Sequence, residues 1–518
     1  MSALRTSHPA RAEIDDALAW LRARVKPGTQ LHADTRSLAA GDAFLAYAVE
    51  GADNRPFIGN AIERGAAAVL YQPEQLATQP DLALAHAVPA LNELAGTIAS
   101  AWYGDPSDAM RVVGVTGTNG KTSCTQWIAA ALSALGTPCA VIGTLGSGMP
   151  GHLVHTGFTT PDAPQLQRSL AQLRSAGALA IAMEVSSHAL HQGRANGTAF
   201  DIAVFTNLTQ DHLDYHRTFV AYEAAKARLF AWPALRVAVI NADDEAGRRL
   251  LASAKGHART IAYSIEGGAS APDVSALLAD QALIASDVRA TATGTAFHLV
   301  SDWGNTDVEV GTLGAFNVSN LLGVLGALLA ADVPFDAALT ELAKLEPVNG
   351  RMQRLGGRPQ NDEPLVVIDY AHTPDALEKT LEALRPIAQT RGGELICMFG
   401  CGGDRDATKR PLMGAIAERC ADSVVVTSDN PRSEDPQNII DQIVAGMTRP
   451  SNARCIEDRA SAILQAIRSA ACEDVIVLAG KGHEATQEIM GKKRAFSDQD
   501  HARLALAARA TQARGGGE

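Results

Sequence analysis

Cysteine is scarce in this sequence, and its few occurrences form no pattern. Seven cysteines are spread over 518 residues, and no two of them make a Cys-x-x-Cys pair. The nearest two, Cys397 and Cys401, have three residues between them. An odd number of scattered cysteines in a long chain argues against a disulfide framework. We interpret them as reduced structural thiols and expect a reducing compartment.

An excess of basic residues is also missing, as is any long apolar run. Lys and Arg number 45 against 57 Asp and Glu, a net charge of −12. This balance argues against general binding to nucleic acid or acidic membranes, although a local positive pocket for an anionic substrate stays possible. Residues 1–20 lack a signal-peptide core, and the longest apolar run, 321–331, contains glycines and is too short to span a bilayer. We expect a cytoplasmic monomer without membrane insertion or nucleic-acid partners.

What the chain does contain is a repeated alternation of apolar strands and helices. Its length suggests about three domains. From residue 110 a strand, a glycine loop and a helix follow one another, which predicts a mostly parallel sheet covered on both faces. A second stretch of this kind begins near residue 345, where four strands end at polar or glycine clusters, as in an open α/β sheet with a site at its carboxyl edge. We therefore predict an α/β protein with domains at 1–106, 107–345 and 346–518, strands at 111–115, 178–183, 202–205, 237–240, 365–368, 395–399, 424–426 and 475–478, and a helix at 122–135.

The segment 116–122, Thr-Gly-Thr-Asn-Gly-Lys-Thr, lies between a predicted strand and a predicted helix. Its glycines allow backbone N–H groups to turn toward an anion, and the helix start adds its positive dipole end. Lys121 would reach terminal phosphates and the Thr122 hydroxyl would hold Mg²⁺. The alternative is a glycine turn with a solvated Lys and Thr. The loop is shorter than the common GxxxxGK[ST] form, yet its placement between strand and helix favours phosphate binding.

Two further residues are ambiguous when taken alone. Glu184 follows an apolar strand and could hold Mg²⁺, although many strands end in an acid. His212 lies in a polar cluster with Asp211, Asp214 and His216. A single histidine is more often a surface or hydrogen-bonded residue than a ligand.

Taken together, the spaced motifs resemble the Mur ligases. The resemblance is carried by 115–122, 183–188, 206–216 and 369–374, and it extends over about residues 34–498. Segments 399–406 and 428–432 are most similar to the members that add meso-2,6-diaminopimelate. The resemblance implies an N-terminal domain for the uridine end, a central ATPase and a C-terminal Rossmann-like domain. It also implies ATP and Mg²⁺ as cofactors, and UDP-MurNAc-L-Ala-D-Glu and meso-diaminopimelate as substrates joined through an acyl phosphate.

The resemblance also implies a role for individual residues. The implied catalytic residues are Lys121, Glu184, His212 and Lys226, and the implied metal ligands are Thr122, Glu184, His212 and Lys226 as an N6-carboxylysine. Without the family, Lys226 would be expected to be a solvated helix lysine. ATP contacts are implied for Gly117, Thr118, Asn119, Gly120, Lys121, Thr122, Ser123, Asn317 and Arg351, with Asn320, Asp369 and His372 at the same junction. Contacts to the UDP substrate are implied for Thr35, Thr159, Thr160, Ser186, Gln192 and Arg194.

The acceptor amino acid is implied by the segment 428–432, Ser-Asp-Asn-Pro-Arg. Diaminopimelate has a second carboxylate where lysine has only hydrogen, and a fixed guanidinium can bind that carboxylate through two hydrogen bonds. The implied acceptor contacts are Arg405, Asp429, Asn430, Pro431, Arg432, Gly480 and Glu484, with Glu484 suited to the ammonium group. The alternatives are a lysine-adding relative, a folylpolyglutamate-type ligase, a cyanophycin synthetase, which would need a larger chain, and a scaffold with a degenerate nucleotide site.

Overall fold

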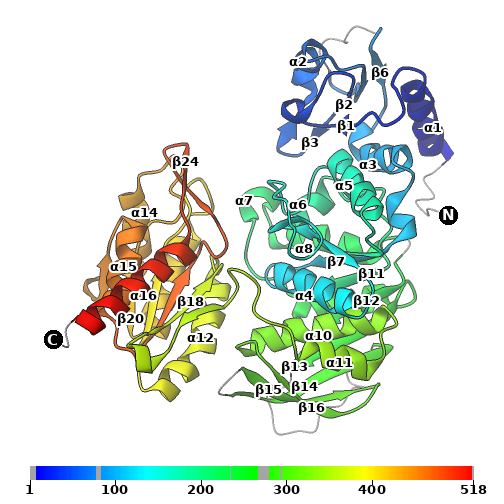
Figure 1. Ribbon diagram of the computed structural model, residues 1–518. Helices are drawn as coiled ribbons and strands as arrows, with labels where there is room; N and C mark the ends of the chain where they lie inside the picture. Colours follow the sequence, from blue (N-terminus) through cyan, green and yellow to red (C-terminus); the bar gives the residue numbers. More distant parts are fainter. Residues whose placement is uncertain (1–7, 77–82, 234, 266–278, 292–293, 516–518) are drawn as a thin grey trace.

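The computed structural model describes residues 8–76, 83–233, 235–265, 279–291 and 294–515. Its helices and strands form three α/β units built on a four-stranded, a ten-stranded and a six-stranded sheet. Figure 1 shows the N-terminal unit above the central one, with the C-terminal unit beside the central one. The predicted α/β class is confirmed.

The N-terminal sheet is parallel, and its strands β1, β2 and β5 are buried on both faces. Alternate strand residues point to opposite cores, one against α1 and α3 and the other against α2. A two-stranded hairpin, β3–β4, projects from this unit. The elements are α1 (His8–Arg22), β1 (Leu31–His32), η1 (Thr35–Ser37), β2 (Ala43–Ala46), β3 (Ala48–Val49), β4 (Ala52–Asp53), η2 (Arg55–Phe57), α2 (Ile58–Glu63), β5 (Ala68–Tyr71), β6 (Ala85–Ala87) and α3 (Leu91–Trp102).

The central sheet has the order β16-β15-β14-β13-β12-β11-β7-β10-β8-β9. The seven neighbouring strands β14, β13, β12, β11, β7, β10 and β8 are parallel. At the two edges, β9 pairs antiparallel with β8, and β15 and β16 continue the sheet antiparallel from β14. A short 3-10 helix, η3 (Pro106–Ala109), leads into the first strand. The strands are β7 (Arg111–Thr116), β8 (Cys139–Gly143), β9 (Gly146–Gly148), β10 (Ala180–Glu184), β11 (Ile202–Phe205), β12 (Val237–Asn241), β13 (Arg259–Ile265), β14 (Gln281–Ala290), β15 (Thr295–Ser301) and β16 (Thr306–Val310).

Helices cover both faces of the central sheet, as the continuous apolar strands require. One core lies between the sheet and α4 (Lys121–Ala134), α10 (Ala315–Ala330) and α11 (Phe335–Leu342). The opposite core includes residues of α5 (Ala163–Ser175), α6 (Ser187–His191), α8 (Phe219–Ala227), η4 (Arg228–Ala231) and α9 (Glu245–Ala254), and the short α7 (Leu213–His216) precedes α8. Within the described residues, no helix combines the length and apolarity needed to cross a membrane.

One predicted strand begins later than the apolar run suggested. The run 178–183 was predicted as a strand, but β10 starts at Ala180 and includes Glu184. Gly177 has a φ of +95°, which turns the chain there, and Leu179 is 56% exposed. The consequence is that the Glu184 carboxylate is fixed by the strand itself and not by the loop that follows.

The C-terminal sheet has the order β17-β18-β22-β19-β20-β21, with only β17 antiparallel. The four predicted strands are its neighbours β18, β22, β19 and β20, so their carboxyl ends meet at one edge, as predicted. The elements are β17 (Gln353–Gly356), η6 (Pro359–Asn361), β18 (Leu365–Asp369), α12 (Pro374–Arg391), β19 (Leu395–Phe399), α13 (Lys409–Cys420), β20 (Ser423–Val426), α14 (Pro436–Val444), η7 (Pro450–Asn452), β21 (Ala453–Cys455), α15 (Arg459–Ser469), β22 (Val475–Ala479), β23 (Thr486–Ile489), β24 (Lys492–Ala495) and α16 (Asp498–Gly515).

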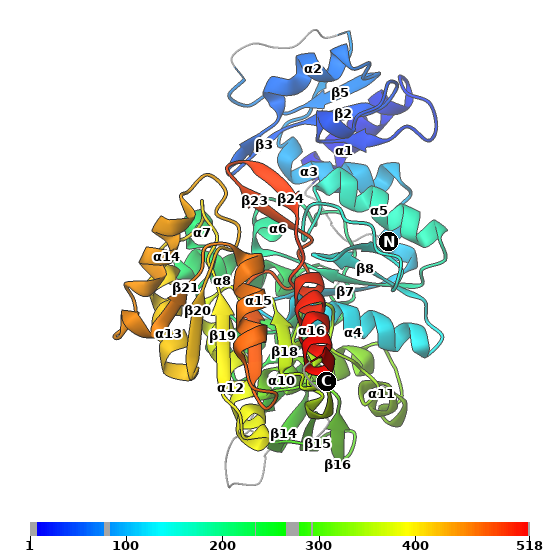
Figure 2. The ribbon, with the colours of Figure 1, turned by 60° about the vertical axis from the view of Figure 1, so that its left-hand side comes forward.

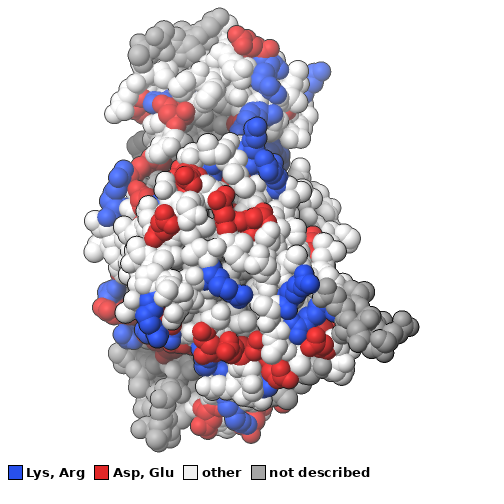
Figure 3. All heavy atoms as spheres, turned by 90° about the vertical axis from the view of Figure 1, so that its left-hand side faces the viewer, with Lys and Arg blue, Asp and Glu red and all other residues white. Residues whose placement is uncertain are grey.

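This unit is also covered on both faces. Helices α12, α13 and α14 enclose one core, and α15 and α16 enclose the other. The β23–β24 hairpin leaves the carboxyl edge, and Figure 2 shows it extending toward the N-terminal unit. On the face drawn in Figure 3, basic and acidic side chains are interspersed, without a continuous stripe of one sign among the described residues.

Candidate active site at the junction of the central and C-terminal units

The phosphate loop connects β7 to α4, as predicted, and two of its glycines are required by close contacts. Gly117 and Gly120 have φ of +149° and +87°. A Cβ on Gly117 would lie 1.8 Å from Thr206 Oγ1, and one on Gly120 would lie 2.3 Å from Asn320 Oδ1. Only glycine fits both positions without displacing these neighbours. The loop therefore keeps its backbone N–H groups at the start of α4, where an anion is favoured.

Two lysines meet this loop. The Lys121 Nζ donates to the carbonyl oxygens of Gly117 at 2.9 Å and Thr118 at 2.8 Å. Lys226, on α8, is 2% exposed and donates to Gly117 at 2.7 Å. The expectation from residues alone, a solvated Lys226, is therefore wrong, because α8 packs its last turn under the loop. Burial, together with the charge of Lys121, places the pKa of Lys226 well below its ordinary value.

Glu184 is the acidic residue of this site. It is 1% exposed, and its carboxylate accepts from the Thr122 hydroxyl at 3.0 Å, from the Thr144 backbone N–H at 2.8 Å and from the Thr144 hydroxyl at 3.1 Å. The strand-end placement predicted for Glu184 thus brings a carboxylate beside Thr122. Oxygen ligands of this kind suit Mg²⁺.

His212 lies within a cluster of rings. It has a left-handed φ of +55°, and its ring meets the edge of His188 at a centroid distance of 4.8 Å. Burial lowers its pKa to about 3, so its imidazole is neutral. Its Nε2 lies 3.4 Å from the Asp211 carboxylate. Within the described residues, no three His, Cys, Asp or Glu side chains converge as a metal site. The metal role of His212 stays a prediction.

The nucleotide residues implied at the junction lie on both units. Arg351 donates to Thr122 Oγ1 at 3.3 Å and lies over the Tyr370 ring, with its Cζ 4.3 Å from the centroid. The buried Asn317 amide donates to Leu313 O, whereas Asn320 contacts the loop at Gly120. A hydrogen bond of 3.1 Å from Asn119 to Asp375 joins the phosphate loop to the first turn of α12. Arg351 and Asn119 therefore link the two units at the loop.

Asp369 and His372 also lie at this junction. Asp369 is buried and accepts from the backbone N–H of Met352 and of Ala371, each within 2.9 Å. His372 shares a hydrogen bond of 2.8 Å with the Tyr370 carbonyl. The Asp369 contacts hold the turn that carries Arg351 against the end of β18.

The implied acceptor residues form a hydrogen-bonded group at the carboxyl edge of the C-terminal sheet. The Asn430 amide donates to Glu484 Oε2 at 2.7 Å and to Asp429 Oδ1 at 3.0 Å. Lys481, which is fully buried, donates to the same Glu484 oxygen at 2.8 Å. Gly480 is needed because a Cβ there would lie 2.4 Å from Asp429 Oδ2. Lys481 lowers the pKa of Glu484 although burial opposes it, so Glu484 is an anion.

Arg432 follows Pro431 in the acceptor loop and has a left-handed φ of +51°. Its backbone N–H donates to Glu488 O at 3.0 Å, and its guanidinium donates to Gly403 O at 2.6 Å. These contacts leave further guanidinium N–H groups free to bind an anion. Arg405 is exposed and does not line the cavity described below. Its acceptor role stays a prediction.

A buried ion pair is hydrogen-bonded to the start of both acceptor loops. Arg459 and Asp498 are both 0% exposed, and the guanidinium donates to the carboxylate at 2.6 Å. Arg459 also donates to the carbonyl oxygens of Ser428 and Ala479. The pair thus holds the ends of two strand-to-loop connections that carry the acceptor residues.

The residues implied for the UDP substrate fall into two places. Thr160 accepts from the Ser186 N–H at 3.1 Å and donates to the Glu184 carbonyl at 2.8 Å. Arg194 donates to the side chain of Gln192 at 2.8 Å and to the Thr160 carbonyl at 3.2 Å, so Thr160, Ser186, Gln192 and Arg194 form one connected group. Thr35 lies in the N-terminal unit at the first turn of η1.

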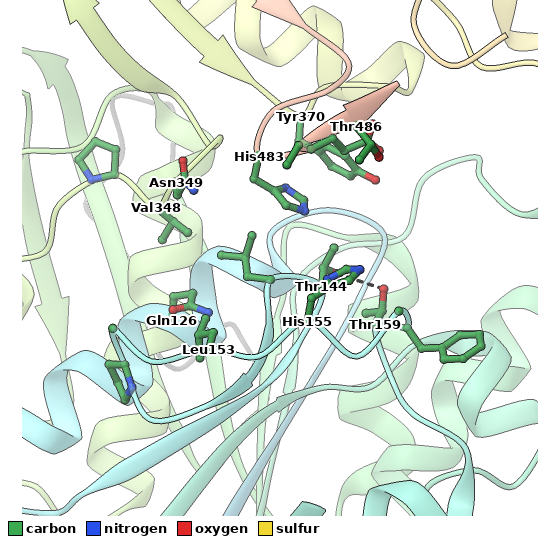
Figure 4. A pocket seen from close by; sticks show the side chains of 18 of the residues that line it. Gln126, Thr144, Leu153, His155, Thr159, Val348, Asn349, Tyr370, His483 and Thr486 are labelled. Carbon is green, nitrogen blue, oxygen red and sulfur yellow. Dashed lines mark hydrogen bonds between the residues drawn. The ribbon is translucent and has the colours of Figure 1, made fainter. Parts of the chain in front are cut away.

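A cavity of about 1200 Å³ separates the central and C-terminal units. Of the implied site residues, Thr159, Asn430, Arg432 and Glu484 line it, whereas the other UDP-side residues and the phosphate-loop residues are not among its lining residues. Figure 4 shows Thr144, His155 and Thr159 on the central side and Tyr370, His483 and Thr486 on the C-terminal side. The Thr144 hydroxyl is hydrogen-bonded to both Thr159 and Glu184, so the cavity lining is connected to the carboxylate beside the phosphate loop.

Sequence reasoning missed several of these residues. Lys481 and His483 lie in the segment 480–484 but were given no role. Thr144 follows β8 directly, and its position after a strand end was an unused signal. Arg459 and Asp498 had no signal in the sequence, because they are two ordinary charged residues 39 positions apart.

Two family models match the chain. One, described as the Mur ligase middle domain, matches residues 115–328, and another, described as the Mur ligase, glutamate ligase domain, matches residues 350–482. A protein of Ralstonia nicotianae named UDP-N-acetylmuramoyl-L-alanyl-D-glutamate–2,6-diaminopimelate ligase is 58% identical, with 99% of this chain and 100% of that protein covered. This chain belongs to the Mur ligase family.

Further relatives agree with this assignment. The protein of the same name from Janthinobacterium sp. is 52% identical over 99% of each chain. A solved structure of a UDP-N-acetylmuramoyl-L-alanyl-D-glutamate–2,6-diaminopimelate ligase is 37% identical, covers 93% of this chain and 95% of that one, and has a TM-score of 0.63. As a Mur ligase, the chain is an ATP-dependent amide ligase that uses ATP and Mg²⁺.

Proposed function

We propose that this Mur ligase adds meso-2,6-diaminopimelate to the D-Glu γ-carboxylate of UDP-N-acetylmuramoyl-L-alanyl-D-glutamate, in peptidoglycan synthesis. The names of its relatives over the full chain support this reaction. A carboxylate is a poor acyl donor, so ATP first converts it to an acyl phosphate. The amine of diaminopimelate then displaces phosphate.

The observation that carries the proposal is that Arg432 and Glu484 both line the cavity. A diamino dicarboxylic acid needs an anion for its ammonium group and a cation for its far carboxylate. Glu484 is ionised and Arg432 has free guanidinium N–H groups, so the wall provides both. Lysine has no far carboxylate and would leave Arg432 without this partner.

The phosphate loop and Glu184, which adjoin the cavity through Thr144, are suited to the nucleotide. The loop 117–120 and the start of α4 favour an anion, and Lys121, now bonded to loop carbonyls, can turn to terminal phosphates. The buried Glu184 carboxylate and the Thr122 hydroxyl fit Mg²⁺ because both present oxygen, and they are 3.0 Å apart. When bound, Mg²⁺ neutralises phosphate charge during transfer. Lys121 and Arg351 can then hold and orient the reacting phosphate, while Glu184 and Thr122 would hold the metal.

We propose that Lys226 is carbamylated, with His212 nearby as a further ligand. Only a neutral amine attacks CO₂, and burial beside Lys121 favours that neutral form. The attack forms an N–C bond and releases one amine proton, which leaves an anionic carbamate. Such an anion would pair with Lys121, where the unmodified ammonium repels it.

The remaining assignments are proposals of the same kind. Thr35 in the N-terminal unit would contact the uridine end, and Thr159, Thr160, Ser186, Gln192 and Arg194 would contact the sugar and peptide. The enzyme would act as a monomer in the cytoplasm, and all seven cysteines are free, as a reducing compartment requires. Light scattering behind size exclusion tests the monomer.

The reaction is tested by phosphate release from ATP with UDP-MurNAc-L-Ala-D-Glu and, in separate arms, meso-diaminopimelate, L-lysine or no acceptor. We expect strong turnover only with meso-diaminopimelate. A preference for lysine would overturn the role of Arg432 but keep the reaction class. Absence of turnover in every arm would favour a folylpolyglutamate-type ligase or a scaffold, which a folate substrate arm separates.

A further inference from the structure

His483 has a fixed orientation between the nucleotide and acceptor sides of the cavity. Its Nδ1 lies 3.2 Å from an N–H nitrogen of Arg351, whose guanidinium also donates to Thr122 at 3.3 Å. The Tyr370 ring lies 5.3 Å from the imidazole and beneath the guanidinium. The backbone is equally tight, because a Cβ on Gly350 would lie 2.2 Å from the His483 nitrogen. Arg351 and His483 therefore form one packed unit.

These contacts determine which ring nitrogen carries the proton. A guanidinium can only donate, so Nδ1 of His483 accepts, and the proton of a neutral ring lies on Nε2. Burial and the Arg351 charge lower the pKa of His483 to about 4, so the ring is neutral near pH 7. His483 in this state is a hydrogen-bond donor at Nε2 and cannot serve there as a base.

The Nε2 edge points into the cavity. Figure 4 shows the imidazole directed from the C-terminal side toward Thr144 and His155 on the central side. Among the described residues, no protein group is hydrogen-bonded to Nε2. Thr144 connects the facing wall to Glu184, and the neighbouring Glu484 belongs to the acceptor wall. A group that touches both the terminal phosphate and the incoming amine must lie between these walls, in reach of His483.

We propose that His483 Nε2–H donates a hydrogen bond to the carbonyl oxygen of the acyl phosphate and stabilises its negative charge during amide formation. In that step the amine nitrogen bonds to the carbonyl carbon, and the π pair moves onto the oxygen. The amine proton passes to solvent, the C–O bond to phosphate breaks, and the carbonyl re-forms. The charged donor at Nδ1 polarises the ring and strengthens Nε2–H as a donor. This role rests on the proposed function.

Two substitutions separate this role from simple support of Arg351. In His483→Gln the side-chain amide can place an N–H near the position of Nε2. In His483→Asn the shorter amide can replace the Nδ1 acceptor for Arg351, but it has no donor at the Nε2 position. The two variants thus keep opposite halves of the imidazole, and each controls for the other.

The measurements are kcat with meso-diaminopimelate, the KM of each substrate, and the first-turnover formation of ADP without acceptor. We expect His483→Asn to lower kcat about 10²- to 10³-fold, as for the loss of one oxyanion donor. His483→Gln should stay within about tenfold of the native enzyme, because its donor remains. ADP formation should persist in both, since no charge develops on the carbonyl oxygen during phosphorylation.

Greater activity in His483→Asn than in His483→Gln, equal activity in the two, or loss of ADP formation in both would overturn the proposal. Each of those results assigns His483 to holding Arg351 or to no role in catalysis. Melting temperatures and ADP binding establish that the variants are folded. If the native enzyme itself fails with meso-diaminopimelate, the proposed function fails and not the role of His483.

Discussion

Lys226 and Lys121 donate hydrogen bonds to the same atom, the carbonyl oxygen of Gly117, at 2.7 and 2.9 Å. Two ammonium groups around one buried oxygen repel each other, and burial raises the cost of each charge. Conversion of Lys226 to a carbamate would replace the repulsion by attraction. It would also add oxygen ligands beside the loop.

The carbamate predicts a carbon signal that depends on one lysine. Protein equilibrated with ¹³C-bicarbonate should show a carbamate carbonyl resonance, and Lys226→Arg should lack it, because a guanidinium stays protonated. Activity in Lys226→Arg should fall about 10²-fold or more, since a fixed cation replaces an anion at the phosphate site. Lys255→Arg, an exposed lysine at the end of α9, is the matched control and should change neither. An unchanged resonance in Lys226→Arg would refute the modification.

Gly120→Ala should weaken nucleotide binding by steric conflict. Gly120 and Gly136 flank the same helix, α4, with φ of +87° and +83°. A Cβ on Gly120 meets Asn320 Oδ1 at 2.3 Å, whereas one on Gly136 has nothing within 4 Å. Both substitutions carry a similar backbone strain of about 1 kcal/mol, so their difference isolates the contact. Calorimetric titration should show ADP binding weakened about 10²-fold in Gly120→Ala and unchanged in Gly136→Ala.

Arg432→Ala should raise the KM for meso-diaminopimelate about 10²-fold and leave the KM for ATP nearly unchanged. Arg432→Gly should raise the KM for meso-diaminopimelate to the same degree. It should nevertheless be more stable than Arg432→Ala by about 1 kcal/mol, because glycine adopts the φ of +51° without strain. Steady-state kinetics and thermal melting measure the two effects. Equal losses for ATP and acceptor would contradict the role of Arg432.

The parts of this protein that the sequence predicted are those controlled by local patterns. The phosphate loop and the four strands β18, β19, β20 and β22 depend on glycine turns and short apolar runs, and they lie within a residue or two of their predicted limits. Lys226 could not be placed in this way, because its burial results from packing between residues 109 positions apart. The same holds for the Arg459–Asp498 pair. The functional roles of the site residues came from the family resemblance.

The Arg459–Asp498 pair predicts a stability effect distant from the cavity. Removal of one partner leaves the other charge buried, so Asp498→Ala should cost about 3–5 kcal/mol. The double variant Arg459→Met with Asp498→Leu should recover part of this loss, because no unpaired charge remains. It should still raise the KM for the acceptor, since Ser428 and Ala479 lose their hydrogen bonds. Urea unfolding and kinetics separate the two effects, and an unaffected KM would show that the pair acts on stability alone.

The neutral state of His483 predicts a specific dependence of stability on pH. Its pKa is about 4 in the folded protein against 6.5 in the unfolded chain, through burial first and then Arg351, with smaller lowering by His155 and Lys481 and an opposing effect of Glu484. Between these values the unfolded chain binds more protons, so stability falls as pH drops from 6.5 to 4. His483→Gln removes this group. Between pH 7 and pH 4 the variant should therefore lose less free energy of unfolding than the native protein, by up to about 3 kcal/mol. His216, with its pKa lowered to about 4, contributes equally to both proteins. Melting curves with identical pH slopes would show that His483 titrates normally, and would remove the basis for a proton held at Nε2.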